Sequence, residues 1–269
     1  MVVSALNEQG FLFSLAVRDK ISLDPPCADA ALQQWKVIST ELPVTAADDS
    51  QTRIDHVLER VGHSGLYLCV ECKRANPKFK QWVFFDPDLH GPFYFESFTA
   101  NQLPIRDRNG AWHAVSRQNQ NGLATFNFYL EVAVNREKKV SSTETIEDAC
   151  RQCVRGQSGF MAKFSEFQNT MKAKAIPVVI TTAQLFEAKI DARNVDLANG
   201  TIKASDLELE HLDFCAVNYR ADDALSPQSQ FAAQNRDLDN FLIFRTRTVF
   251  VVQSGCLVKF LTWVNGINL

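Results

Sequence analysis

Apolar side chains recur at helical spacing over residues 7–21 and predict an amphipathic helix there. A Pro-Pro pair follows and predicts a loop. Three further apolar segments, rich in β-branched and aromatic residues, predict strands at residues 35–44, 52–59 and 65–74. The first of these segments could also be a helix end that runs into a strand. A fourth segment, residues 82–85, continues the apolar pattern after a turn.

The middle of the chain is less regular, although two elements stand out. Residues 84–112 are rich in aromatic residues, Pro and Gly, and we expect an irregular surface excursion there. Residues 125–135 alternate between apolar and polar side chains, which predicts a strand. The sequence Ser141-x-x-Glu144 has the form of a capping box and predicts the start of a long helix that reaches Phe167.

Gly156 and Gly159 interrupt this long helix, and we expect them to kink or divide it. The β-branched run that opens residues 176–190 predicts a strand covered on both faces. A polar stretch follows. Residues 248–253 then predict a late strand, and residues 257–264 predict a closing helix.

This order of elements predicts one α/β domain over residues 1–269, with a mixed β-sheet flanked by helices. The chain is 46% hydrophobic and 22% charged, an ordinary globular composition. No window approaches the roughly 18 uncharged apolar residues of a membrane span, and the amino terminus lacks the pattern of a secretory signal. The seven cysteines show no framework spacing. We therefore expect reduced thiols, a cytoplasmic location and no membrane contact.

The strongest chemical signal lies in the second and third predicted strands. Glu71 and Lys73 are two residues apart in an apolar strand and so share one face, while Asp55 lies on the strand before. Burying such charges is costly without a purpose. Mg²⁺ usually takes one or two protein carboxylates, which makes Asp55 and Glu71 candidate metal ligands. Lys73 could then orient or help deprotonate an attacking water, and Glu41 is a candidate fourth member. The alternative is an ordinary Glu–Lys pair on an exposed sheet face.

With Asp55 on one strand and Glu71-Cys72-Lys73 on the next, the segment resembles the PD-(D/E)XK nuclease superfamily, also called restriction-endonuclease-like. Members of that family place an Asp ahead of a (D/E)xK strand, in a core of helix, three strands, helix and strand. The resemblance covers about residues 5–190 and leaves 191–269 as a carboxyl-terminal extension with the late strand and helix. It departs at Ile54, where the family name has Pro.

The resemblance implies a nuclease dependent on Mg²⁺ or Mn²⁺ that hydrolyses phosphodiester bonds, with DNA as the expected substrate, in restriction, repair or defence. Many members carry a further acid on the first helix or strand. Glu8 and Glu41 both qualify for that role, and Glu41 is favoured because Glu8 near a helix start could simply favour the helix dipole. Some members place a Gln on the helix after the strands, and Gln152 lies there in this chain. A solvent-facing or core-edge amide is the alternative for Gln152.

Two other functions fit the same residues. One is an inactive module of the nuclease fold that binds nucleic acid or protein. The other is an unrelated α/β protein in which Glu71 and Lys73 only pair with each other. If the protein cuts both strands of a duplex, a homodimer would be favoured.

A basic cluster follows the acidic strand and consists of Lys73, Arg74, Lys78 and Lys80. These residues could contact phosphates, or they could be the solvated end of a strand. The net charge of -3 argues against indiscriminate coating of nucleic acid. Arg245 and Arg247 could likewise meet phosphates or form a charged strand entry. Aromatic residues beyond the basic cluster could stack bases, although core packing is the more probable role.

Two cysteine pairs, Cys69-x-x-Cys72 and Cys150-x-x-Cys153, have the spacing of zinc half-sites. Positions three apart on a strand face opposite ways, however, and the second pair fits small core residues on a helix. We therefore do not expect zinc. The five histidines show no metal spacing, and we expect His56 to point away from its neighbour Asp55.

Overall fold

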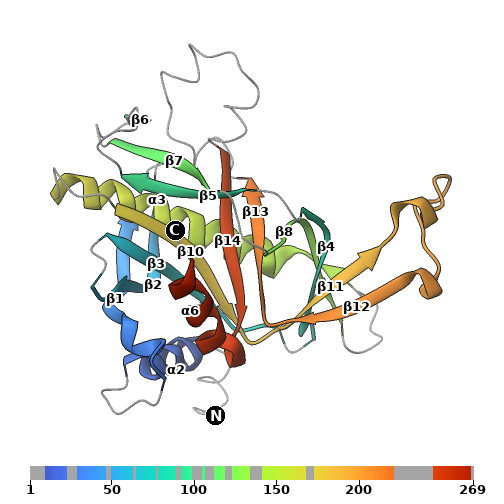
Figure 1. The fold of residues 1–269 in the computed structure, drawn as a ribbon, viewed down its shortest axis with the longest axis horizontal. Coiled ribbons are helices and arrows are strands. Elements are labelled where there is room, and N and C mark those ends of the chain that lie inside the picture. The colour runs from blue at the N-terminus through green and yellow to red at the C-terminus, as the bar shows by residue number, and fades with distance from the viewer. Residues whose placement is uncertain are drawn as a thin grey trace.

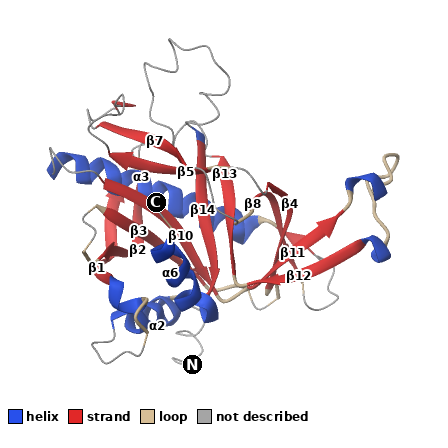
Figure 2. Ribbon diagram, viewed as in Figure 1, coloured by secondary structure: helices blue, strands red, loops and turns tan. Residues whose placement is uncertain are grey.

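The computed structural model describes residues 10–22, 29–46, 50–62, 65–76, 78–88, 92–98, 105–106, 112–118, 123–133, 141–167, 173–220 and 245–267. Three α-helices lie in these ranges: α2 (Phe11–Ser22), α3 (Glu144–Phe167) and α6 (Leu257–Gly266). The strands are β1 (Trp35–Thr45), β2 (Gln51–Arg60), β3 (Leu66–Lys73), β4 (Gln81–Asp88), β5 (Phe93–Phe98), β6 (Ile105–Arg106), β7 (Trp112–Gln118), β8 (Thr125–Val132), β9 (Ser141–Ser142), β10 (Ala173–Thr181), β11 (Gln184–Ile190), β12 (Leu207–Leu212), β13 (Phe214–Arg220) and β14 (Thr246–Gln253). Figures 1 and 2 show their arrangement.

Most of these strands join one mixed sheet. Along it, successive neighbours are β1, β2, β3, β10, β14, β13, β8, β4, β11 and β12. The first three strands pair antiparallel in chain order, whereas β10 runs parallel to both of its neighbours, β3 and β14. The predicted α/β class with a mixed sheet is confirmed. Residues 35–44, which could have been a strand or a helix end that runs into one, form a strand that follows a short 3-10 helix, Leu32–Gln34.

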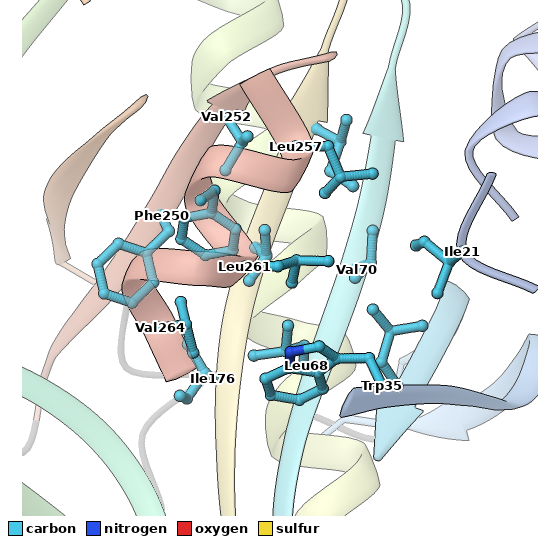
Figure 3. Close-up of a cluster of buried hydrophobic side chains, with 14 of the residues drawn as sticks. Ile21, Trp35, Leu68, Val70, Ile176, Phe250, Val252, Leu257, Leu261 and Val264 are labelled. Carbon is cyan, nitrogen blue, oxygen red and sulfur yellow. The ribbon is translucent and has the colours of Figure 1, made fainter. Parts of the chain in front are cut away.

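The long crossover from β3 to β10 contains α3, and helices cover both faces of the central sheet. Alternate residues of β10 pack on opposite sides: Ile176 and Val178 lie in one hydrophobic cluster, and Ala175 and Val179 belong to the clusters on the α3 side. The late strand and the closing helix form as predicted, and α2 and α6 cover the face away from α3. Figure 3 shows the cluster under α6, in which Leu257, Leu261 and Val264 lie over Leu68, Val70, Ile176, Phe250 and Val252.

The amino terminus of α3 is capped by a buried carboxylate rather than by the predicted capping box. The helix begins at Glu144, and Ser141 lies outside it, in β9. Oε1 of Glu131, on β8, accepts hydrogen bonds from the backbone N–H groups of Thr145 at 2.5 Å and Ile146 at 3.1 Å. These N–H groups have no partner within the helix, and a carboxylate there also interacts favourably with the helix dipole.

Gly156 and Gly159 do not divide this helix, because α3 is continuous over 24 residues. The two glycines instead allow strands to approach closely. A Cβ on Gly159 would lie 2.8 Å from the backbone oxygen of Thr45, and one on Gly156 would lie 2.9 Å from Cγ1 of Ile54. The hairpin of β1 and β2 thus packs directly on the helix backbone.

The expectation of an irregular excursion over residues 84–112 is also wrong for part of that range. Residues 93–98 form β5, which pairs antiparallel with the start of β10 and with β7. Its Phe95 and Glu96 are fully buried. The aromatic content that suggested irregularity serves the core.

The hairpin of β11 and β12 projects from the body of the sheet, on the right of Figure 1. Asn199 and Gly200 form a turn near its tip, as their sequence suggests, with Gly200 at φ +63. Across the part of the chain that the structure describes, no helix is both long enough and apolar enough to cross a membrane.

Candidate active site

The candidate site lies where β2 and β3 stop pairing. Their antiparallel ladder runs from Glu59↔Tyr67 to His56↔Val70 and ends there. The next residue of β2 is Asp55, and its carboxylate reaches across to β3, where Oδ2 accepts a hydrogen bond of 2.7 Å from the backbone N–H of Cys72. A side chain thus replaces the strand partner. β3 itself continues along β10 as far as Lys73.

Glu71 and Lys73 point from β3 toward α3, on the face that strand alternation predicts. Lys73 Nζ lies 3.5 Å from Glu71 Oε1 and donates a hydrogen bond of 2.7 Å to Oε1 of Gln152 on α3. The Glu71 side chain is 11% exposed and the Lys73 side chain 22% exposed. The pair is therefore not the solvated surface pair of the alternative interpretation. Gln152 is partly exposed, and its side chain contacts Lys73.

Burial and like charge both act on the two carboxyl groups. Burial, followed by the charge of Asp55, raises the pKa of Glu71 from 4.5 to about 8, against the opposing effect of Lys73. Burial also raises the pKa of Asp55, although the hydrogen bond from Cys72 opposes that rise. Two carboxyl groups that resist ionisation side by side form a site that a cation would stabilise in its charged form.

Glu41 lies across from Asp55 on β1. Its neighbours Thr40 and Leu42 pair with His56 and Ile54 of β2, the residues on either side of Asp55. Glu41 has a φ of +50, which is uncommon for a residue with a side chain. Its carboxylate lies 3.9 Å from the guanidinium of Arg53. The charge of Glu41 contributes to raising the pKa of both Asp55 and Glu71.

The donor set fits a hard divalent cation with two protein ligands. Among the described residues, no three His, Cys, Asp or Glu side chains form a group that could hold a metal ion by themselves. Glu41 therefore acts on Asp55 and Glu71 from a longer distance. Mg²⁺ commonly takes only one or two carboxylates and completes its shell with water and phosphate oxygens, a number that Asp55 and Glu71 can supply.

The other residues considered from the sequence are placed differently. Arg74 is partly exposed and lies next to Lys73, while Lys78 and Lys80 are exposed on the segment that leads to β4. Glu8 lies outside the described residues. Arg247 is unavailable to phosphates, because it is fully buried and its Nη2 forms an ion pair of 2.9 Å with Glu96.

The aromatic residues that follow the basic cluster are mostly in the core. Trp82, Phe84 and Phe95 have no exposed surface, and Phe93 has almost none. They cannot stack on bases in this conformation. Core packing, the interpretation favoured from the sequence, is confirmed for these four residues.

The cysteines and His56 have structural roles. Cys69 and Cys72 face opposite sides of β3, and Cys150 and Cys153 are buried in the core beneath α3. Cys69 shares the Glu71 face but is itself buried in the core. Nε2 of His56 lies 3.0 Å from both the hydroxyl and the backbone oxygen of Ser14 on α2, so the ring points away from Asp55 as expected.

Two cations near the site were not anticipated from the sequence. Arg53 precedes Asp55 by two residues, and this spacing puts both side chains on one face of the strand. Lys163 follows Gln152 by eleven residues, or close to three helical turns, which puts both on one face of α3. Both spacings can be read from the sequence. The spacing of Lys163 from Gln152 points to the site only because Gln152 contacts Lys73.

Searches against protein-family models, curated proteins and solved structures gave no match to this chain.

Proposed function

We propose that this protein is a metal-dependent nuclease that hydrolyses phosphodiester bonds, with DNA as its substrate. One observation carries the proposal: Asp55, Glu71 and Lys73 meet at the point where two strands separate, and Gln152 from α3 joins them. The order of elements supports it as well. Helix α2, strands β1 to β3, helix α3 and parallel strand β10 follow the order expected of a PD-(D/E)XK core, with β4 to β9 inserted between β3 and α3.

Each residue of the site has its own role in the proposed hydrolysis. Asp55 and Glu71 would hold a Mg²⁺ or Mn²⁺ ion, which when bound supplies charge neutralisation and a more acidic water. Lys73 Nζ has three donors, one of which Gln152 accepts, so the ammonium is held beside Glu71 and can still donate toward a phosphate oxygen or a water. Gln152 fixes the position of Lys73, and Glu41 adds negative charge that favours retention of the cation.

The activity test uses matched variants. Purified protein is incubated with plasmid and with single-stranded DNA, in Mg²⁺ or Mn²⁺. We expect Glu71→Ala and Lys73→Ala to lower the cleavage rate at least about 100-fold, the scale expected of groups that act in the chemical step. The control is the exposed pair Lys189 and Glu210 on the projecting hairpin, whose Ala variants should cleave at the wild-type rate. Equal cleavage by the Glu71 and Lys73 variants would refute the assignment.

A titration with Mn²⁺ separates an enzyme from an inactive module of the same fold. Calorimetry on the wild-type protein should show one binding event that is lost in Asp55→Asn. Binding that needs Asp55, together with metal-dependent cleavage, supports the enzyme. Binding of DNA without any cleavage in either metal would favour the inactive module instead.

A further inference from the structure

A groove of about 300 Å³ opens beside the candidate site, between the far end of the β1–β2 hairpin and α3. Its lining comes from Pro43, Val44, Thr45, Gln51, Thr52, Arg53 and Lys163. Both charged residues in this lining are cations, and the other residues include two threonines and a glutamine. A groove with this chemistry suits an anion with several oxygens.

β2 and α3 each carry one residue of the candidate site and one charged residue of the groove. Arg53 and Asp55 are two residues apart on β2, a rise of about 7 Å, and their side chains share a face. Lys163 and Gln152 are eleven residues apart on α3, a rise of about 16 Å along the same face of the helix. Glu41, which acts on Asp55 electrostatically, also contacts Arg53, so it connects the two places.

The two glycines of α3 let the hairpin pack directly on the helix between the candidate site and the groove. Gly156 and Gly159 lie between Gln152 and Lys163 on the same helix face, and they contact Ile54 and the β1 backbone directly. The hairpin therefore covers the helix at these two glycines, and Gln152 and Lys163 lie on α3 at the two ends of the covered stretch. Lys163 Nζ donates a hydrogen bond of 2.5 Å to the backbone oxygen of Pro43 and keeps two further donors for a ligand.

Arg53 is held only weakly in its present position. Its side chain is 71% exposed and its ion pair with Glu41 spans 3.9 Å. Exposed pairs of this kind contribute little free energy, so Arg53 can exchange Glu41 for a stronger partner. The guanidinium can bind two phosphate oxygens at once in a bidentate geometry.

We infer that Arg53 and Lys163 form a phosphate-binding subsite for a polynucleotide strand whose scissile phosphate lies at Asp55 and Glu71. This inference rests on the proposed function, and it adds the path of the substrate: from Asp55 past Arg53 along the β1–β2 hairpin to Lys163. Spacings of about 7 Å from Asp55 to Arg53 and about 16 Å from Gln152 to Lys163 correspond to a few nucleotides along one strand.

The test measures binding without cleavage. Fluorescence anisotropy of a labelled single-stranded 12-nucleotide DNA is recorded in EDTA across a range of salt concentrations. We expect the double variant Arg53→Gln/Lys163→Gln to bind at least about 10-fold more weakly than wild type at low salt. Its plot of log K against log salt should lose about 1.4 units of slope, since each phosphate contact on a single strand contributes about 0.7.

The matched control is Arg193→Gln/Lys259→Gln, because these exposed cations also pair with carboxylates but lie away from the groove. It should bind with wild-type affinity and slope. Thermal melting of every variant establishes that each is folded. A groove variant that melts like wild type and keeps wild-type affinity and slope overturns the subsite, as does wild-type protein that does not bind the strand. Loss of the proposed nuclease activity is scored separately, by the Glu71 and Lys73 variants in metal.

Discussion

Replacing Glu71 by Gln should stabilise the metal-free protein, and the gain should depend on pH. Glu71 is buried beside Asp55, and its pKa is raised from 4.5 to about 8 in the folded state, chiefly by burial. The folded protein therefore binds the Glu71 proton more tightly than the unfolded chain does. The stability that this protonated carboxyl contributes is complete below pH 4.5 and is lost as the pH rises toward 8.

The size of the effect follows from the pKa difference. Each pH unit between 4.5 and 8 weakens the folded state by about 1.4 kcal/mol. At pH 7 the accumulated loss is at most about 3 kcal/mol, a sizeable fraction of the stability of an ordinary domain. Gln has the shape of Glu and no charge, so Glu71→Gln removes this loss. It also removes a negative charge that acts on Asp55 from nearby.

The assay is urea denaturation of wild type and Glu71→Gln in EDTA, at half-unit steps from pH 4.5 to 8.5. The difference in the free energy of unfolding should be near zero at pH 4.5, grow through neutral pH and level off above pH 8. Glu208→Gln, on the exposed strand β12, is the control and should show no such growth. A difference that stays constant across this range would refute the account, because it would mean that the folded protein does not hold the Glu71 proton more tightly.

Three further predictions concern the fold. Gly159→Ala should lower the free energy of unfolding by about 1–3 kcal/mol, because its Cβ would lie 2.8 Å from a backbone oxygen. The control Gly266→Ala has nothing within 4 Å of its Cβ and should keep the wild-type stability. Equal urea midpoints for the two variants would contradict the close packing. Arg247→Met should cost about 3–5 kcal/mol by removing the cation that faces buried Glu96, and adding Glu96→Gln should recover part of that loss. Glu131→Ala should cost about 1–2 kcal/mol through the lost cap of α3; unchanged thermal melting would argue against a capping role.

The residues of the candidate site were accessible from the sequence because strand alternation is a local property. Two residues on one strand share a face wherever the strand lies, so the pairing of Glu71 with Lys73 needed no knowledge of the fold. The meeting with Asp55 required only that adjacent strands pair. The contact of Gln152 with Lys73 was different, since it depends on how a helix crosses the sheet.

The errors have a common physical origin in packing between distant segments. Gly156 and Gly159 have poor helix propensity, but the close approach of β1 and β2 outweighs that local preference. The cap of α3 comes from Glu131, a residue of another element, so a local capping motif could not reveal it. Arg247 was expected to meet phosphates or to form a charged strand entry, yet Glu96 from β5 compensates its charge inside the core.

The hydrogen bond between Lys73 and Gln152 joins residues that lie 79 positions apart. During synthesis the β2–β3 hairpin leaves the ribosome before α3, which follows only after β4 to β9 have been made. Closing a loop of this length is slow and entropically costly. A nascent or truncated chain that ends before α3 thus presents Asp55 and Glu71 without the amide that holds the lysine, and full assembly of the site becomes a late event in folding.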